Sequence, residues 1–418
     1  MIDLLKKLYP ICRSITGNGV RETLNIIKHM IPINIYEIQS GEKVYDWVIP
    51  KEWNINDAWI KNEKGEKIIN FKHNNLHILN YSGPINKKIN FEELDKHLFY
   101  IEDYPEAIPY LTTYYKENWG FCLSYEQYKQ LNKNEIYEIY IHSNLENGYL
   151  TYADLIIKGK TEKEILFSCY ICHPSMCNDS LSGVVVAVEL IKYLLEIKDD
   201  LYYTYRFIFI PETIGSITYI NKNFDVLKNN VIGGLVLTCC GDEGDFTYIK
   251  TLNESSYINK IIFKIFKDNN INLKIREFYT CGSDERQYNY PGIDLDIGSL
   301  IKTKYGEFKE YHTSKDDFNL VTEKGLNETL EMYKKVIYYL ENNKIYNNNV
   351  LCEPKLGKYN LYPDIGGLRI KDDSKYFRII MYYINSKNDI IDISDKLNLS
   401  FEKIIYYIDI LKKNNLII

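Results

Sequence analysis

Continuous apolar runs alternate with segments of helical spacing from about residue 146 onward. Apolar strands are expected at EILFSCYICHP, YTYRFIFIP, GGLVLTCCG and IDLDIGSL. Helices are expected from near Ser182, as a short helix at ETIGSITYINKN, over SSYINKIIFKIFKDN and over residues 322–342. Strands that are apolar throughout are typical of a parallel sheet with both faces covered. The pattern therefore predicts an α/β region with a mostly parallel sheet between helices.

The preceding part of the chain has a different pattern. Residues 2–9 and 21–31 have helical spacing, whereas residues 45–145 contain short alternating segments separated by turn residues. One of these segments, AWIKNEKGEKIINF, predicts a hairpin that turns at Lys64 and Gly65. Short alternating runs with frequent turns indicate a β-rich module over residues 45–145.

The C-terminal part is predicted to be a helix-turn-helix domain. An Asn-, Pro- and Gly-rich stretch over residues 346–369 reads as a linker, and residues 370–418 read as three helices with a final NNLII strand. The last helix, FEKIIYYIDILKK, has mixed charge and carries most of its basic residues at its end. A DNA-reading helix needs a basic, polar face. This pattern argues against nucleic-acid binding and favours a scaffold or dimer contact.

Composition narrows the class of protein. The 418 residues carry a net charge of −6 and are 45% hydrophobic, which is ordinary for a globular protein and gives no electrostatic case for nucleic acid or an anionic membrane. The longest apolar runs fall short of the roughly 20 residues that a membrane-spanning helix needs. No signal-peptide pattern opens the chain, and the nine cysteines form no disulfide framework. A reduced, cytoplasmic protein without a membrane partner is expected.

Candidate chemistry lies at three strand ends. His173 and Asp179 follow the first strand, Glu212 follows the second, and His312 precedes the last long helix. Ligands of α/β sheets collect where strands end, and imidazole and carboxylate are natural zinc ligands. A carboxyl group in apolar surroundings also suits general base catalysis. Each residue has a plainer interpretation as a loop or helix-capping residue, so spacing alone leaves a metal site undecided.

The cysteines around His173 suggest two other kinds of site. Cys169, Cys172 and Cys177 superficially resemble a zinc knuckle, but positions three apart in a strand point to opposite faces. A catalytic thiol at Cys177 or Cys239 has no supporting local motif, and buried cysteines usually serve packing. The cysteines are therefore expected to be structural.

Four motifs in order, CHPSMCNDSLSG, PETIGS, GSDERQYNYPGID and YHTSKDD, resemble the M28-type zinc aminopeptidases. They are most similar to the DUF4910 branch, aminopeptidase-like proteins of polysaccharide biosynthesis loci. The resemblance covers essentially the whole chain. It implies an α/β fold with a zinc-aminopeptidase-like mixed sheet, covered by helices on both faces, an inserted DUF2172-type β-rich domain and a C-terminal winged helix. The implied domains are 1–44 with 146–345 (catalytic), 45–145 (insert), 346–369 (linker) and 370–418 (winged helix).

The resemblance also implies roles for individual residues. The metal ligands of the family fall on His173, Asp179 and His312, and its general base falls on Glu212. Two family ligands are absent, because Thr213 stands where the second Glu of the pair is expected and Thr238 lies near the position of an Asp ligand. Ser175 also stands where the family has a catalytic Asp. The implied site therefore holds one zinc ion on three protein ligands, with an open position for water or substrate.

Substrate contacts are expected from residues near this site. The family's substrate-proximal Ser-Asp-His segment falls on Ser283 to Glu285, so Asp284 and Glu285 are candidates. Arg286 and Arg13 are candidates for binding a carboxylate or sugar acid. The aromatic residues Tyr114, Tyr115 and Trp119 are candidates for a wall that stacks on a sugar or peptide.

The sequence leads to one main functional hypothesis. It is a zinc-dependent, aminopeptidase-like hydrolase of a small peptide or an amino-acid/sugar amide, linked to polysaccharide biosynthesis. A catalytically inactive metal- or ligand-binding module with the same fold is an alternative. A winged-helix transcription regulator with a sensory domain is another, and a homo-oligomer is left open.

Overall fold

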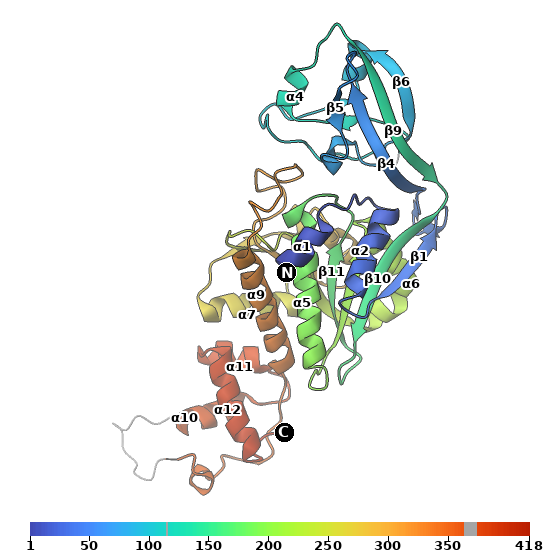
Figure 1. Cartoon of the computed structure of the whole chain (residues 1–418). Helices are drawn as coiled ribbons and strands as arrows, with labels where there is room; N and C mark the ends of the chain where they lie inside the picture. Colours follow the sequence, from blue (N-terminus) through green and yellow to red (C-terminus); the bar gives the residue numbers. More distant parts are fainter. Residues whose placement is uncertain (114–115, 363–373) are drawn as a thin grey trace. The chain divides into compact units, whose positions relative to one another are not determined.

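The computed structural model describes residues 1–113, 116–362 and 374–418 (Figure 1). The chain forms two compact units. The first comprises Met1–Ile258 and Leu273–Met332, and the second comprises Asn259–Asn272 and Tyr333–Ile418.

An eight-stranded mixed sheet forms the centre of the first unit. Its order is β1-β10-β12-β11-β13-β16-β14-β15. The strands, in that order, are Asn34–Gln39, Tyr149–Ile157, Thr204–Ile210, Glu164–Tyr170, Val231–Val236, Ile297–Ile301, Phe246–Ile249 and Leu273–Arg276. The four central strands, β12, β11, β13 and β16, are mutually parallel, whereas β10 and β14 run antiparallel to their central neighbours. The apolar runs of the sequence are therefore the parallel centre of the sheet.

Two helices cover opposite faces of this centre. The chain passes from β11 to β12 through α5 (Gly183–Glu196) and from β12 to β13 through α6 (Ile214–Asn230). Because β12 and β13 lie on opposite sides of β11 and such crossovers are right-handed, the two helices lie on opposite faces. The carboxyl ends of the central strands and the first turns of these helices consequently meet at one edge of the sheet.

Smaller helices complete the first unit. They are α1 (Ile2–Leu8), α2 (Asn18–Lys28), α8 (Glu285–Tyr288) and the start of α9 (Glu323–Asn342). Helix α2 lies against β10, α1 against α5, and α8 against β16 and α6. The apolar side of α2 presents Val20, Leu24 and Ile27, which are buried. The two helices predicted from the spacing over residues 2–9 and 21–31 are therefore confirmed.

A second, four-stranded antiparallel sheet lies in residues 52–146. Its order is β5-β4-β9-β6, formed by Lys67–Asn70, Glu52–Lys61, Ile136–Glu146 and Ile85–Asn90. The predicted hairpin between β4 and β5 is confirmed, and Gly65 in its turn has φ of +81°, a value that glycine adopts without strain. Two further pairs of strands are present: β2 (Lys43–Val44) pairs with β3 (Trp47–Val48), and β7 (Leu98–Phe99) pairs with β8 (Phe121–Cys122). The region also contains the short helices α3 (Phe91–Asp95) and α4 (Tyr125–Lys129).

Three local predictions were wrong. The segment at ETIGSITYINKN is the start of the 17-residue helix α6 rather than a short helix. Strands β14 and β15 were missed because each is only four residues long, and β15, at the sheet edge, also has little apolar patterning. Strand β11 ends at Tyr170, so Cys172 lies beyond it and strand alternation does not govern its direction.

The second unit is helical. It contains most of α7 (Tyr257–Asn269), the end of α9, and the three helices α10 (Ser374–Tyr383), α11 (Ile390–Leu397) and α12 (Phe401–Lys413). Within it, Lys260 binds the carboxylates of Asp389 and Asp392 at 2.6 and 2.7 Å. The C-terminal residues do not form a separate strand as expected, because Ile417 makes only an isolated bridge with Asn348.

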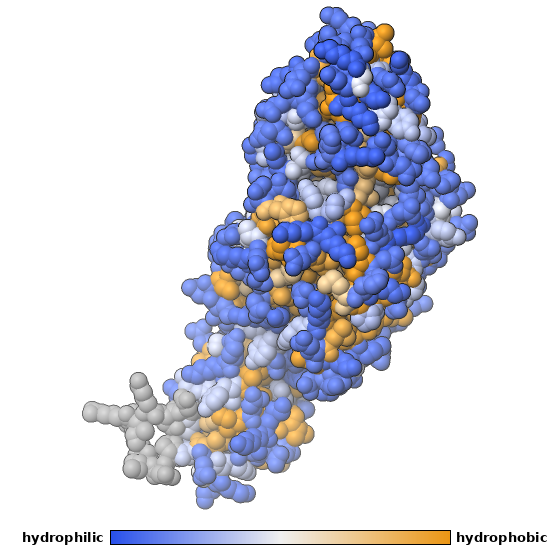
Figure 2. Space-filling model, in the orientation of Figure 1, coloured by the Kyte–Doolittle hydropathy of each residue, from blue (hydrophilic) through white to orange (hydrophobic). Residues whose placement is uncertain are grey.

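The surface offers no large hydrophobic belt on the face drawn in Figure 2, where hydrophobic residues form small groups among hydrophilic ones. Across the described residues, no helix combines the length and apolar character required to span a bilayer.

Candidate metal centre

Three segments converge at the edge of the large sheet. His173 follows β11, Asp179 lies in the turn Cys177–Ser182 before α5, and His312 lies in the loop between β16 and α9. One ligand atom from each of these residues falls within 4.8 Å of the others. Nε2 of His312 is 3.1 Å from Oδ2 of Asp179. The structure thus brings together residues that are up to 139 positions apart in the sequence (312 − 173).

Backbone contacts fix the three segments. Arg13 Nε donates to the carbonyl oxygen of His173 at 2.9 Å. The carboxylate of Asp316, in the His312 loop, accepts the backbone N–H groups of Asn178 and Asp179 at 2.5 and 2.8 Å. These bonds satisfy backbone donors at a turn that enters a helix, where they would otherwise be unpaired. They also tie the loop of one candidate ligand to the turn of another.

A close backbone approach also positions the Asp179 turn. A Cβ atom at Gly183 would lie 2.1 Å from the carbonyl oxygen of Leu237, so only glycine allows the first turn of α5 to pack against the end of β13. The hydroxyls of Tyr170 and Thr238 both donate to Oδ1 of Asp179, with Thr238 at 3.2 Å. Burial opposes ionisation of Asp179, but His173, His312 and Tyr170 outweigh it and hold the pKa of that carboxyl below its usual value.

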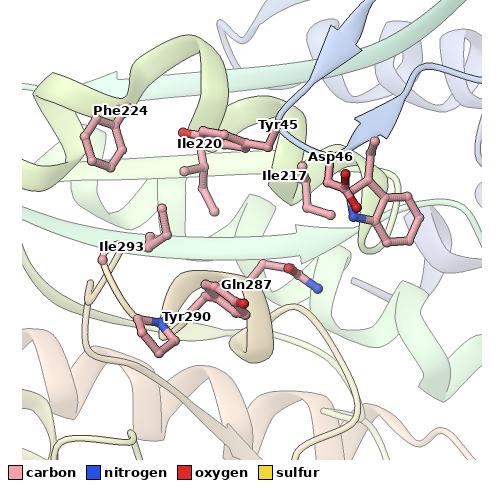
Figure 3. A pocket seen from close by; sticks show the side chains of 11 residues that line it. Tyr45, Asp46, Ile217, Ile220, Phe224, Gln287, Tyr290 and Ile293 are labelled. Carbon is pink, nitrogen blue, oxygen red and sulfur yellow. The ribbon is translucent and has the colours of Figure 1, made fainter.

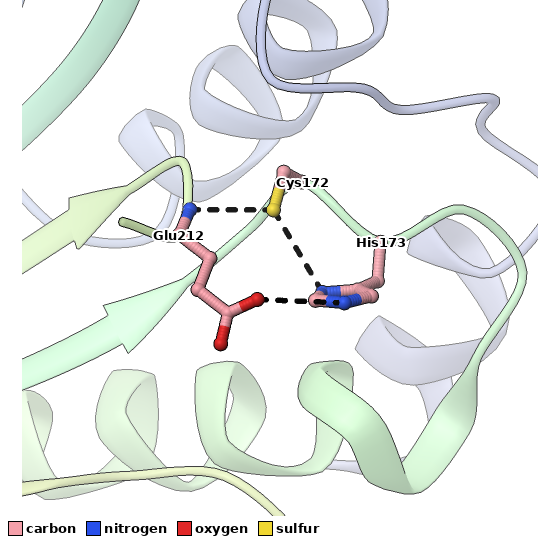
Figure 4. A group of neighbouring side chains, drawn as sticks. All are labelled: Cys172, His173 and Glu212. Carbon is pink, nitrogen blue, oxygen red and sulfur yellow. Dashed lines mark hydrogen bonds and ion pairs between the residues drawn. The ribbon is translucent and has the colours of Figure 1, made fainter. Parts of the chain in front are cut away.

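Glu212 approaches His173 from the end of β12. Its Oε2 atom lies 3.7 Å from Nε2 of His173 (Figure 4). Ser283 Oγ donates to its Oε1 atom at 2.6 Å. Burial, with the nearby carboxylates of Asp284 and Asp179, raises the pKa of Glu212 well above its usual value. A carboxylate of raised pKa is a stronger base, which suits proton abstraction at this position.

Cys172 lies on the other side of the His173 ring. Its Sγ atom is 3.7 Å from Nδ1 of His173 and accepts the backbone N–H of Glu212 at 3.3 Å (Figure 4). Burial raises the pKa of this thiol well above its ordinary value, whereas a cysteine binds metal as the thiolate. Cys172, His173 and Glu212 do form a second compact group, but its geometry fits a thiol that orients the imidazole and the start of α6.

The donor set of His173, Asp179 and His312 fits a divalent metal such as zinc. Nε2 of His312 is buried and makes no hydrogen bond, although it lies beside a carboxylate. Burial lowers the pKa of His173 to about 4, which keeps the imidazole neutral, the form that binds metal. Two neutral imidazoles and one carboxylate are a known catalytic zinc set.

The positions that depart from the family pattern are engaged elsewhere. Ser175 Oγ donates to the carbonyl of Tyr9 at 3.1 Å and accepts from Asn75 at 2.9 Å. Thr213, at the start of α6, donates its backbone N–H to Asp284 at 2.7 Å. With Thr238 bound to Asp179, none of the three departures supplies a carboxylate to the centre.

A cavity of about 210 Å³ adjoins the centre. It is lined by Ile15, Trp47, Tyr110, Thr112, Cys172, His173, Glu212, Thr213 and His312. Tyr110 comes from the region of the second sheet, and its ring meets His173 and His312 edge to face, with centroids 5.2 and 5.1 Å apart. Both the large sheet and the residue 45–145 region therefore contribute to the walls.

The expected substrate residues have different surroundings. Asp284 and Glu285 are fully buried, and neither lines the cavity. Asp284 accepts from the Thr213 N–H and from Ser216 Oγ, and Glu285 accepts from Ser299 and Tyr305. Burial raises the pKa of Asp284 to about 7. Both carboxylates therefore support the wall behind Glu212. Their direct contact with substrate stays a prediction, and their burial argues against it.

The two arginines also differ. Arg13 is fully buried and donates to the carbonyls of Leu8 and His173, and burial lowers the pKa of Arg13 to about 10. It holds the His173 backbone and has no surface to offer a substrate. Arg286 is exposed and donates to the carbonyl of Ser283 at 3.0 Å, so it stays a candidate for substrate binding.

Four residues at the centre were not recognised from sequence: Trp47, Tyr110, Tyr170 and Asp316. Tyr170 is the last residue of β11 and Asp316 is the first aspartate of the YHTSKDD motif, so their positions near candidate ligands were a usable signal. Nothing in the local sequence of Trp47 or Tyr110 distinguishes them from other aromatics. Of the proposed aromatic wall, Tyr114 and Tyr115 lie outside the described residues, and Trp119 stacks on His97 with centroids 3.6 Å apart, away from the cavity.

Comparisons with known proteins agree with this fold. A family model described as a domain of unknown function, DUF4910, matches residues 2–343, and a winged helix-turn-helix model matches residues 344–418. A Clostridium acetobutylicum protein, named for polysaccharide biosynthesis and an aminopeptidase-like domain, is 46% identical over 420 residues. The match covers 99% of this chain and 95% of that protein.

Solved structures give the same result. A crystal structure from Clostridium acetobutylicum, described as that of a peptidase, matches with a TM-score of 0.92 at 45% identity and covers 100% of this chain and 95% of that one. BSAP, a zinc aminopeptidase from Bacillus subtilis, matches with a TM-score of 0.56 at 10% identity, over 81% of this chain and 94% of that one. The α/β aminopeptidase-like fold with a C-terminal winged helix is confirmed.

Proposed function

Because the chain belongs to the DUF4910 family, we propose that it is a zinc-dependent hydrolase with an aminopeptidase-like centre at His173, Asp179 and His312. The observation that carries the proposal is the convergence of their ligand atoms within 4.8 Å, with a buried imidazole nitrogen that lacks a hydrogen bond. That nitrogen lies 3.1 Å from Oδ2 of Asp179, so the two atoms are close enough to bind the same ion.

The reaction is hydrolysis of an amide. Zinc bound to the three residues would supply an electrophile and a water of lowered pKa. Glu212 accepts the proton of the attacking water and later donates it to the leaving amine, since its carboxylate lies beside Nε2 of His173. Ser283 orients that carboxylate through its hydrogen bond to Oε1. Arg286 is the group on this edge that can bind a carboxylate of the substrate.

One ion is favoured over two. Oδ2 of Asp179 faces His312, whereas Oδ1 is occupied by the hydroxyls of Tyr170 and Thr238. A second ion bridged by Asp179 would have to displace these hydroxyls, and Ser175 and Thr213 offer it no carboxylate. A three-residue site with an open position matches the catalytic zinc pattern.

The substrate class proposed is a small peptide or an amino acid joined to a sugar by an amide, in polysaccharide biosynthesis. The name of the Clostridium acetobutylicum relative supports the second form. The proposed domains are 1–44 with 146–345, 45–145, 346–369 and 370–418. The separate sheet within residues 52–146 and the boundary between the two family models at residue 343 support this division.

Zinc stoichiometry tests the centre. Protein stripped with chelator, reloaded with zinc and desalted should hold one equivalent by elemental analysis. His173→Ala and His312→Ala should each hold far less, because two protein ligands rarely retain zinc. His142→Ala, a change at an exposed histidine on β9, is the matched control and should hold one equivalent. Full loading of both site variants would contradict the proposal.

A further inference from the structure

A second, larger cavity lies beside the candidate metal centre. Its volume is about 590 Å³, and it is formed by three segments (Figure 3). They are the β2–β3 hairpin with Tyr45, Asp46 and Trp47, helix α6 with Ile217, Ile220 and Phe224, and α8 with the stretch after it, which contribute Gln287 and Tyr290–Ile293. Pockets of roughly 300–1,000 Å³ are typical of sites for small organic ligands.

This cavity shares a lining residue with the cavity at the proposed centre. Trp47 lines both the larger cavity and the 210 Å³ cavity at His173 and Glu212. Helix α6 begins directly after Glu212 and Thr213, so the wall made by Ile217 and Ile220 extends from the candidate base. The two cavities are therefore neighbours, and we infer that a molecule whose amide lies at Glu212 extends past Trp47 into the larger one.

The lining combines exposed aromatic rings with two polar groups. Tyr45, Trp47 and Tyr290 are 46%, 37% and 63% exposed, an unfavourable arrangement for rings that have no ligand. Asp46 and Gln287 place a carboxylate and an amide among them (Figure 3). Aromatic faces accept the C–H surface of a ring, while a carboxylate and an amide accept from and donate to hydroxyls. A hexopyranose presents both kinds of surface.

The hairpin that carries two of these rings is held in place. Tyr45 has φ of +52°, a strained value for a bulky residue that persists only where the surroundings impose it. Val44 is buried in the core, and Glu42 pairs with Lys222 of α6. The site is therefore preformed before a ligand binds, which lowers the entropy cost of association.

We propose that the cavity binds a hexopyranose ring, and that this ring is the sugar part of the amide substrate. The link to the substrate rests on the proposed function, whereas sugar binding itself does not. A purely apolar side chain would use neither Asp46 nor Gln287. An ammonium group held by aromatic rings would fill only a small part of 590 Å³.

Ligand-detected saturation-transfer NMR on the full chain tests the inference. The probes are N-acetylglucosamine, N-cyclohexylacetamide, which has the same amide and ring size without hydroxyls, and choline. N-acetylglucosamine should receive saturation at its ring protons and bind more tightly than both others. Tighter binding of N-cyclohexylacetamide or of choline, or no transfer to N-acetylglucosamine, would overturn the proposal.

Three variants test whether the sugar binds in this cavity. Asp46→Asn should weaken N-acetylglucosamine binding roughly tenfold, the value of a hydrogen bond to a charged group. Tyr290→Ala should weaken it as well, while Tyr279→Ala, at a tyrosine that is 84% exposed and outside the cavity, should leave it unchanged. Equal affinities for all three variants and the unaltered chain would locate the sugar elsewhere and reject the site.

A metal-site variant separates this inference from the proposed function. His173→Ala should lose zinc yet bind N-acetylglucosamine with unaltered affinity, because His173 does not line the larger cavity. If the unaltered chain binds the sugar but no zinc, only the metal proposal is rejected. If it binds zinc but no sugar, only the cavity proposal is rejected.

Discussion

At the residue scale, each candidate ligand has a partner that fixes its orientation. Cys172 contacts Nδ1 of His173, and Tyr170 donates to Asp179. Tyr311 stacks on the ring of His312 with centroids 3.9 Å apart. Such contacts orient ligands and typically matter to metal affinity nearly as much as the ligands themselves. The chemistry of the centre therefore depends on neutral neighbours as well as on its ionisable groups.

Glu212 is the residue whose role can be isolated most sharply. In Glu212→Gln, hydrolysis of an aminoacyl amide or an aminoacyl-glucosamine should fall by about 10² or more, because the amide cannot take a proton. Zinc content should stay at one equivalent, since Glu212 is not a proposed ligand. Initial rates under saturating substrate, with zinc measured on the same samples, give both readouts.

The matched control for this measurement is Glu162→Gln, a change at an exposed glutamate outside both cavities. It should retain full turnover. Unchanged turnover in Glu212→Gln would reject the base assignment. Zinc binding with no turnover in the unaltered chain, over a panel of such amides, would instead favour a binding module that kept the fold.

At the element scale, the region of residues 45–145 is joined to the centre by backbone pairing. The N–H of Tyr110 donates to the carbonyl of His312 at 2.8 Å, and the N–H of Ser314 donates to the carbonyl of Ile108 at 2.8 Å. Pro109 and Thr313 form an antiparallel bridge between them. This pairing supports His312, whose φ of +53° is unusual for a residue other than glycine.

Tyr110 should accordingly act as a positioning residue for the metal. Tyr110→Ala removes the ring that contacts both histidines, and zinc affinity should fall roughly tenfold, as for other residues that orient ligands. Competition between the protein and a chromogenic chelator measures the affinity. Tyr110→Phe keeps the ring edges and should restore affinity to near that of the unaltered chain.

A structural role alone would give a different result for this pair of variants. If Tyr110→Ala lowered the unfolding temperature but bound zinc as tightly as Tyr110→Phe, the ring would serve only packing. The phenylalanine variant also shows whether the tyrosine hydroxyl contributes, since it lacks only that group.

At the scale of the whole molecule, the charges on the last helix of the helix-turn-helix unit bear on the prediction that the unit does not read DNA sequence. The buried side of α12 consists of Phe401, Ile404, Tyr407, Ile408 and Leu411, at helical spacing. Its exposed positions carry Glu402, Lys403, Tyr406, Asp409, Lys412 and Lys413, a mixture of both charges. Phosphate contacts dominate DNA affinity and are favoured by a basic surface, so the mixed charge of this helix supports the prediction.

The full chain should therefore show no sequence preference for DNA. Selection of bound duplexes from a random pool at physiological salt should return sequences without a consensus, because an unspecific interaction reads only phosphates. Recovery of a palindromic consensus with half-sites about one helical turn apart would identify a regulator instead. The same selection with Lys403→Glu would then show whether α12 is the reading helix.

The sequence by itself determined the elements whose pattern is dictated by burial. The central strands are apolar throughout because both of their faces are covered, and the amphipathic helices α2 and α12 follow from period 3.6. Strand ends then placed His173, Glu212 and the Asp179 turn at one edge. Strands β14 and β15 were missed because four residues are too few to show a pattern, and β15 is also half-exposed at the sheet edge.

Only the tertiary structure decided what each polar residue near the centre does. Arg13 and Asp284 read as charged loop residues in sequence, yet both are buried and hold backbone groups rather than facing the cavity. Tyr110 and Trp47 reach the centre from a separate region, by contacts between residues far apart in the chain. The local sequence fixes propensity and periodicity, whereas burial and partnership depend on long-range packing, and these set pKa, ligand geometry and the shape of the cavities.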